Sequence, residues 1–191
     1  MLGSALTSVL TSAFGKVIEV NRIGVPMVTS NPCLSIDASQ KINFDEVFNG
    51  QRIDYVVNAI GMIKQVINEK DPSDLAKAQS INCEFVTKLN EYSDAREVPV
   101  IQIGTDCVFS GSRGNYIETD TFEATDIYSK TKIAGEKSSP ASMILRTSIV
   151  GREIRSSHSI LEWILAQKEN SEVNGYTNHI WNGITTFHFA N

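Results

Sequence analysis

The sequence lacks the features that mark a membrane, secreted or metal-binding protein. No apolar run approaches the roughly 20 residues that a transmembrane helix needs. The apolar segment 1–14 has no basic region before it, unlike a secretory signal. The 3 cysteines include no C-x-x-C pair, and the 3 histidines show no ligand spacing. We therefore expect a cytoplasmic protein with reduced, buried thiols and no bound metal.

An excess of basic charge is also missing. The 191 residues carry a net charge of −5, which argues against a surface for nucleic acid or for an anionic membrane. The composition, 41% hydrophobic and 20% charged, is typical of a folded protein and not of a disordered one. The length allows one substantial domain with a partial appendage.

Short β-branched runs alternate with segments of helical periodicity along the chain. Strands are expected over residues 17–20, 33–36, 55–59, 98–103 and 143–146. Helices are expected over residues 2–14, 44–48, 72–92, 128–137 and 157–168. This alternation predicts an α/β domain with a doubly wound parallel sheet, covered by helices on both faces. The polar segment 110–126 is expected to form a loop above the strand ends, where such sheets bind ligands.

Tyr128 and Lys132 stand four residues apart, so a helix would place both side chains on one face. A tyrosine ionises at about pH 10, and a nearby ammonium lowers that pKa by stabilising the phenolate. The pair could then protonate a carbonyl oxygen as hydride arrives. Taken alone, the spacing also fits a surface tyrosine beside a solvated lysine. Thr105 favours the catalytic interpretation, because it follows the apolar strand 98–103 and offers a second hydroxyl.

Several ordered motifs then carry a resemblance that spans essentially the whole chain. Residues 105–111 read Thr-Asp-Cys-Val-Phe-Ser-Gly, and residues 116–120 read Tyr-Ile-Glu-Thr-Asp. Residues 128–136 read Tyr-Ser-Lys-Thr-Lys-Ile-Ala-Gly-Glu, and residues 144–151 read Ile-Leu-Arg-Thr-Ser-Ile-Val-Gly. Together they resemble the extended short-chain dehydrogenases/reductases, most of all the dTDP-4-dehydrorhamnose reductase group. The resemblance implies a Rossmann-like, NAD(P)-binding fold.

The resemblance also implies an activity and its catalytic residues. The reaction would be NADPH-dependent reduction of the 4-keto group of a nucleotide-linked deoxysugar, for polysaccharide precursor synthesis. Tyr128 would be the acid, Lys132 would also hold the nicotinamide ribose, and Thr105 would orient the keto oxygen. Asn82 matches an asparagine that supports the active site, although it could equally be a polar residue on a helix face.

Substrate contacts are implied at Val108, Phe109 and Trp181. For Trp181, burial as a core aromatic remains an equal alternative. Residues 62–65 depart from the usual reductase pattern, which leaves the sugar open. A sugar-nucleotide epimerase or dehydratase and a non-catalytic, reductase-like regulatory subunit remain alternatives, and a homodimer is left open.

Cofactor binding in the resembled family uses a G-x-x-G-x-x-G turn after the first strand. Only the last glycine is matched here, by Gly3, so we expect the first strand to be missing and its two neighbours unpaired. Arg22 favours NADPH because arginine accommodates a 2′-phosphate, while NADH remains open. The other implied cofactor contacts are Asn21, Asp37, Asn58, Ala59, Gly61, Tyr128 and Lys132. We expect an NAD(P)-binding domain over 1–151 and a partial substrate-binding region over 152–191.

Overall fold

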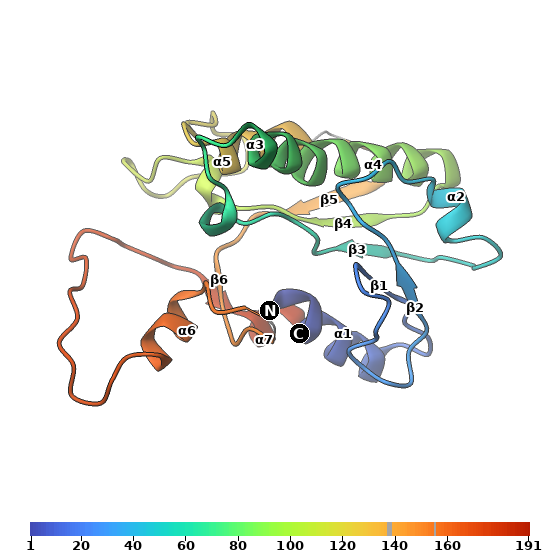
Figure 1. Cartoon of the computed structure of the whole chain (residues 1–191). Helices are drawn as coiled ribbons and strands as arrows, with labels where there is room; N and C mark the ends of the chain where they lie inside the picture. Colours follow the sequence, from blue (N-terminus) through green and yellow to red (C-terminus); the bar gives the residue numbers. More distant parts are fainter. Residues whose placement is uncertain (137–138, 155) are drawn as a thin grey trace.

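A three-stranded parallel sheet lies at the centre of the molecule (Figure 1). The computed structural model describes residues 1–136, 139–154 and 156–191. The strands of this sheet, in spatial order, are β3 (Val56–Asn58), β4 (Val100–Ile103) and β5 (Ser142–Leu145). One face is covered by α3 (Pro72–Gln79), α4 (Phe85–Arg96) and α5 (Ile127–Gly135). The predicted α/β class with parallel strands and helices on both faces is confirmed, since α1 (Leu2–Ala13) lies on the opposite face.

Two smaller parallel pairs flank the central sheet. One joins β1 (Glu19–Asn21) to β2 (Cys33–Ser35), and the other joins β6 (Ile149–Val150) to β7 (Ile184–Thr185). The described strands therefore form three separate sheets instead of one continuous sheet. β1 lies next to β3 in Figure 1, but no ladder of hydrogen bonds joins them, as expected for these two strands.

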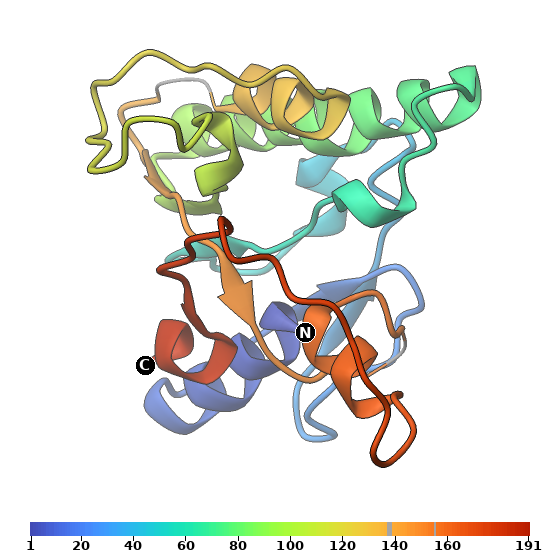
Figure 2. The same ribbon diagram turned by 90° about the vertical axis from the view of Figure 1, so that its left-hand side faces the viewer.

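Two apolar clusters hold the helices on the sheet. The larger one lies between the central sheet and the helices α2 (Phe44–Val47) and α4. Its buried members are Ile36, Ala38, Phe44, Phe48, Phe85, Val86, Leu89 and Val100. The second cluster packs Leu2 and Leu6 of α1 against Ile103 of β4. It extends to α7 (Thr186–Ala190), which Figures 1 and 2 both place beside α1.

The long helix expected over 72–92 is interrupted in the structure. Asp71 caps its start by accepting a hydrogen bond from the Ser73 N–H, and Pro72 occupies the first turn. After α3 comes η2 (Ser80–Glu84), a π-helical turn, and then α4 runs on to Arg96. π-helical turns occur frequently at functional sites. This one presents Asn82 and Cys83 to the interior.

Other expectations need correction. Tyr55 is 68% exposed and precedes β3 instead of forming part of a buried strand. The helix expected over 157–168 shortens to α6 (Ile160–Leu165), and most of its apolar stripe is exposed because no element covers it. Cys107 is exposed and Cys33 is half-buried, so the thiols are unpaired but not all buried. The helix expected over 128–137 ends at Gly135, and residue 137 lies outside the described residues.

No helix in the described ranges combines the length and apolar character needed to span a membrane.

Candidate active site

A chain of hydrogen bonds between buried polar groups lies at the carboxyl ends of β3 and β4. Asn58 Nδ2 donates to Gln102 Oε1 at 2.7 Å, and Asn58 Oδ1 accepts from the Ile60 N–H at 3.0 Å. Gln102 Nε2 in turn donates to the Ile103 carbonyl at 3.1 Å. Lys132 Nζ donates to that same carbonyl at 2.8 Å. This chain of hydrogen bonds therefore fixes the Lys132 ammonium at the end of β4.

The start of α5 is fixed by its capping residue. Asp126 accepts hydrogen bonds from the Ser129 N–H at 3.0 Å and the Ser129 hydroxyl at 3.1 Å. Its carboxylate also lies 3.3 Å from Lys64 Nζ. Because the Asp126 cap holds the first turn of the helix, it also sets the position of Tyr128 in that turn.

Thr105 and Tyr128 lie close to each other in the structure. Thr105 is buried two residues after the end of β4, where its Oγ1 accepts from the Cys107 N–H at 3.2 Å. It also lies close enough to the half-buried Tyr128 to lower the pKa of the phenol. The helix and the strand end that sequence reasoning paired are thus in contact in the structure.

The pKa of Tyr128 differs from the expectation. Burial raises it to about 12, and the hydrogen bond with Thr105 offsets only part of that rise. We expected Lys132 to lower this pKa. The expectation is wrong for this structure, because the Lys132 ammonium is bound to the Ile103 carbonyl instead of the phenol. Burial also lowers the pKa of Lys132, against the opposing effect of Glu136.

Asn82 is buried in η2 and links three segments. Its Oδ1 accepts from the Met62 N–H at 2.8 Å, and its Nδ2 donates to the Met62 carbonyl and to Thr131 Oγ1, both at 3.1 Å. Gly135 allows α5 to approach this turn, because a Cβ there would overlap the Asn82 carbonyl oxygen. The arrangement agrees with a supporting role for Asn82, which remains a prediction.

The expected cofactor residues fall into two groups. Asn21 is occupied within its own turn, where its Oδ1 accepts from the N–H groups of Ile23 and Gly24. Ala59 is half-buried against the cluster beneath α1. Arg22 and Asp37, in contrast, follow β1 and β2 with exposed side chains.

Two glycines leave room beside these residues. Gly3 lies exposed in the first turn of α1, and no atom lies within 4 Å of the position that a Cβ would take. A Cβ on Gly61 would lie 3.4 Å from Asn82 Oδ1 and 3.8 Å from Lys132 Nζ. The turn after β3 therefore approaches Lys132 without a side chain between them, which fits a site where a ligand meets the backbone.

The three expected substrate residues are not brought together. Val108 has no exposed surface, so its side chain offers a ligand no contact. Phe109 is half-buried and stacks on Tyr116, with ring centroids 4.6 Å apart. Trp181 is 45% exposed and packs over Gly183, and no hydrogen bond or aromatic contact within the described ranges joins it to Thr105.

Sequence reasoning missed Gln102, Asp126 and the pair Glu136–Arg146. Gln102 left a signal, since it interrupts the apolar strand 98–103. Asp126 precedes a helical segment and is a typical N-cap residue. Arg146 Nε lies 2.8 Å from Glu136 Oε2, but nothing in the spacing of these two residues predicts the ion pair.

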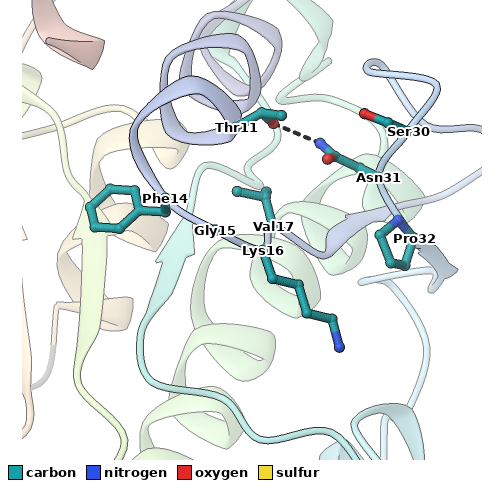
Figure 3. Close-up of a pocket in the computed structure, with 8 residues that line it drawn as sticks. All are labelled: Thr11, Phe14, Gly15, Lys16, Val17, Ser30, Asn31 and Pro32. Atoms are coloured by element: carbon teal, nitrogen blue, oxygen red, sulfur yellow. Dashed lines mark hydrogen bonds between the residues drawn. The ribbon is translucent and has the colours of Figure 1, made fainter.

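Two hollows lie outside the Thr105–Tyr128 contact. The first, shown in Figure 3, lies at the amino ends of β1 and β2, and Thr105 and Tyr128 are not among its lining residues. Its lining includes Thr11 and Asn31, which share a hydrogen bond of 2.8 Å. The second, of about 330 Å³, lies at the carboxyl end of β5 and is lined in part by Arg146 and Phe189.

Parallel strands with threonine, tyrosine and lysine gathered at their carboxyl ends define a Rossmann-like domain of the short-chain dehydrogenase/reductase type. The family model described as RmlD substrate binding domain matches residues 1–173. The chain belongs to this family.

One relative is a dTDP-4-dehydrorhamnose reductase of Aggregatibacter actinomycetemcomitans, 36% identical over 80 residues. That match covers 39% of this chain and 27% of the relative, so the chain matches only a minor part of that protein's length.

Solved structures agree with the fold. A hypothetical dTDP-4-dehydrorhamnose reductase from Sulfolobus tokodaii matches with a TM-score of 0.65 and 25% identity, over 80% of this chain and 54% of that one. A dTDP-4-dehydrorhamnose reductase from Clostridium acetobutylicum matches with a TM-score of 0.70 and 19% identity, over 91% and 67%. The Bordetella bronchiseptica enzyme WbmG, in complex with NAD and UDP, matches with a TM-score of 0.65 and 17% identity, over 79% and 51%.

Proposed function

We propose that this chain forms the cofactor-binding part of an NADPH-dependent reductase that acts on the 4-keto group of a nucleotide-linked deoxysugar. The observation that carries the proposal is the placement of Lys132 Nζ on the Ile103 carbonyl at the carboxyl end of β4, with Tyr128 on the same helix and near Thr105. Membership in the RmlD substrate binding domain family supports the sugar-nucleotide class. The proposal includes a cytoplasmic role in making a polysaccharide precursor, with residues 1–151 as the cofactor domain and residues 152–191 as part of the substrate region.

In this proposal the chain's own residues hold the keto oxygen and supply its proton. Thr105 and Tyr128 would both donate hydrogen bonds to that oxygen, which becomes an alkoxide when hydride adds to the carbon. Tyr128 then transfers its phenolic proton to the alkoxide. With a pKa of about 12, the phenol carries its proton at neutral pH but is a weaker acid than an ordinary tyrosine, and it can still protonate the alkoxide, which is a much stronger base.

The residues present fit a nicotinamide dinucleotide, because Gly61 leaves the space beside Lys132 open and Arg22 is exposed after β1. Such a cofactor supplies the hydride when bound. Lys132 would hold the nicotinamide ribose, Arg22 would favour the 2′-phosphate of NADPH, and Asp37 would contact the adenine.

Replacing Tyr128 with Phe tests the proton-donor role. We expect the rate of keto-sugar reduction to fall roughly 10²- to 10⁴-fold, the usual contribution of a general acid. NADPH binding should stay close to that of the unmodified chain, because the phenyl ring is retained. Fluorescence titration of NADPH and a spectrophotometric rate assay measure the two effects, and undiminished turnover would remove Tyr128 from this role.

A non-catalytic regulatory role is the second candidate. The observation that favours it is the bond between Lys132 and the Ile103 carbonyl, which keeps the ammonium away from the phenol. Under this alternative the chain would bind NADPH but would turn over no keto-sugar. The same titration and rate assay, performed on the unmodified chain, separate the two candidates.

A further inference from the structure

A buried ion pair lies one helical turn beyond Lys132. Glu136 follows Lys132 by four residues, at the end of α5, and only 2% of its side chain is exposed. Its Oε2 lies 2.8 Å from Nε of Arg146, which follows β5. A carboxylate this deeply buried is stabilised only where a partner compensates its charge. Arg146 supplies that compensation on one side.

The second oxygen of Glu136 faces the segment between Ile103 and Thr105. Glu136 Oε1 is buried and has no hydrogen-bond partner among the described residues. A Cβ on Gly104 would lie 2.8 Å from it, so the backbone at Gly104 passes close to this oxygen. Gly104 joins Ile103, whose carbonyl holds Lys132, to Thr105, whose hydroxyl contacts Tyr128. The carboxylate thus lies against the backbone that carries both site contacts.

Arg146 extends the contact to the polar loop. Its guanidinium lies 4.9 Å from the centre of the Phe122 ring, and Nη1 approaches the Glu118 carbonyl at 3.5 Å. The ion pair therefore connects α5 and β5 to the loop 110–126. Phe109, one of the expected substrate contacts, immediately precedes that loop, and its ring centre lies 6.0 Å from that of Phe122.

We infer that Glu136 and Arg146 form a positioning pair, which holds the Lys132 ammonium in its charged form at the carboxyl end of β4. Glu136 is the charged group that acts on Lys132 within the described structure. The hydrogen-bond partner of the ammonium, the Ile103 carbonyl of β4, is uncharged, and so is the Gly61 backbone that approaches it. Burial lowers the pKa of Lys132, and Glu136 opposes that effect. Neither residue of the pair is assigned a direct contact with substrate.

The replacement Glu136→Gln tests the inference, because it keeps the shape of the side chain and removes its charge. Nuclear magnetic resonance of the lysine side chains, with the Lys132 signal assigned from Lys132→Arg, follows the titration of Lys132 without cofactor or substrate. We expect the midpoint to move to lower pH in Glu136→Gln. Glu91→Gln is the matched control, since it removes one carboxylate from the exposed pair with Lys88. A Lys132 midpoint that moves no more than in this control would overturn the inference.

Glu136→Asp keeps the test valid if Glu136→Gln does not fold. It retains the negative charge at a shorter reach, so the Lys132 midpoint should stay closer to that of the unmodified chain than in Glu136→Gln or in Glu136→Met, both of which remove the charge. If the Lys132 midpoint in Glu136→Asp is displaced as far as in a folded variant that lacks the charge at residue 136, then that charge does not act on Lys132.

The inference depends on the proposed function only through the role of Lys132 in cofactor binding. NADPH affinity should fall about tenfold in Glu136→Gln, the change that 1.4 kcal/mol produces. If the unmodified chain binds no NADPH but the Lys132 midpoint still shifts, the proposed function fails and the positioning pair stands. If NADPH binds and the midpoint is unchanged, the positioning pair fails alone.

Discussion

The contact between Gly135 and the π-helical turn gives a sharp test of how α5 is held. In Gly135→Ala the new Cβ would overlap the Asn82 carbonyl oxygen and lie 3.2 Å from the Asn82 carbonyl carbon. Both are backbone atoms of a helical turn, so no flexible side chain can move aside. Inserting a methyl group into a packed site costs about 1–3 kcal/mol. Alanine recovers at most about 1 kcal/mol of helix propensity, and less at the last residue of a helix.

We therefore expect Gly135→Ala to lower the free energy of unfolding by about 1–2 kcal/mol. In a protein of this size, each kcal/mol corresponds to roughly 2–4 °C in the melting temperature. Urea unfolding followed by far-ultraviolet circular dichroism measures the free energy, and a thermal melt gives the second value.

Gly3→Ala is the control for this measurement, because Gly3 also lies in a helix but no atom lies within 4 Å of its Cβ position. It should leave stability unchanged or raise it by up to about 1 kcal/mol. If Gly135→Ala unfolds at the same urea concentration as Gly3→Ala, the close approach of α5 to η2 does not constrain the fold.

Two other replacements test single side chains. Replacing Arg22 with Asp should shift the ratio of kcat/KM for NADPH over NADH by at least about tenfold toward NADH, because a carboxylate repels the 2′-phosphate; an unchanged ratio would mean that Arg22 does not contact this group. Asp126→Asn tests the cap of α5 through pH. Burial raises the pKa of Asp126, but hydrogen bonds from Ser129 and the Lys64 ammonium lower it by more, so the net shift is downward. A lowered pKa stabilises the folded state above the unfolded value of about 3.9, and that stabilisation is lost as the pH falls through the folded value. In urea unfolding from neutral to acid pH, the advantage of the unmodified chain over Asp126→Asn should shrink on acidification, and an advantage that grows would contradict this assignment.

The fold class could be predicted from the sequence because it depends on local periodicity. Alternating apolar strands and helical segments identify parallel strands covered by helices, and the α1 and α5 boundaries agree closely with the prediction. The stripe of α6 shows the limit of this reasoning. Periodicity predicts that Ile160 and Ile164 share a face, but it does not say whether another element covers that face, and both are exposed.

The contacts of the candidate site depend on register and on side-chain direction. Asn58 and Gln102 are neighbours because β3 and β4 pair with these two residues opposite each other, a register that no local pattern specifies. The Tyr128–Lys132 spacing correctly places both residues on one helix, but the direction of the lysine is set by the Ile103 carbonyl. The contact between Thr105 and Tyr128 agrees with the order of the motifs along the chain.

The π-helical turn also affects how this chain can tolerate insertions and deletions. A π-helical turn bonds residue i to i+5 and so holds one residue more than an α-helical turn. Losing one residue within Ser80–Glu84 could restore a continuous α-helix while rotating the residues on one side of the deletion by about 100° relative to the other. Asn82 could then no longer reach both Met62 and Thr131, although the helix itself would survive. In this segment the helical content and the geometry of the site are therefore separable. A deletion could abolish the site geometry without a measurable loss of helical content.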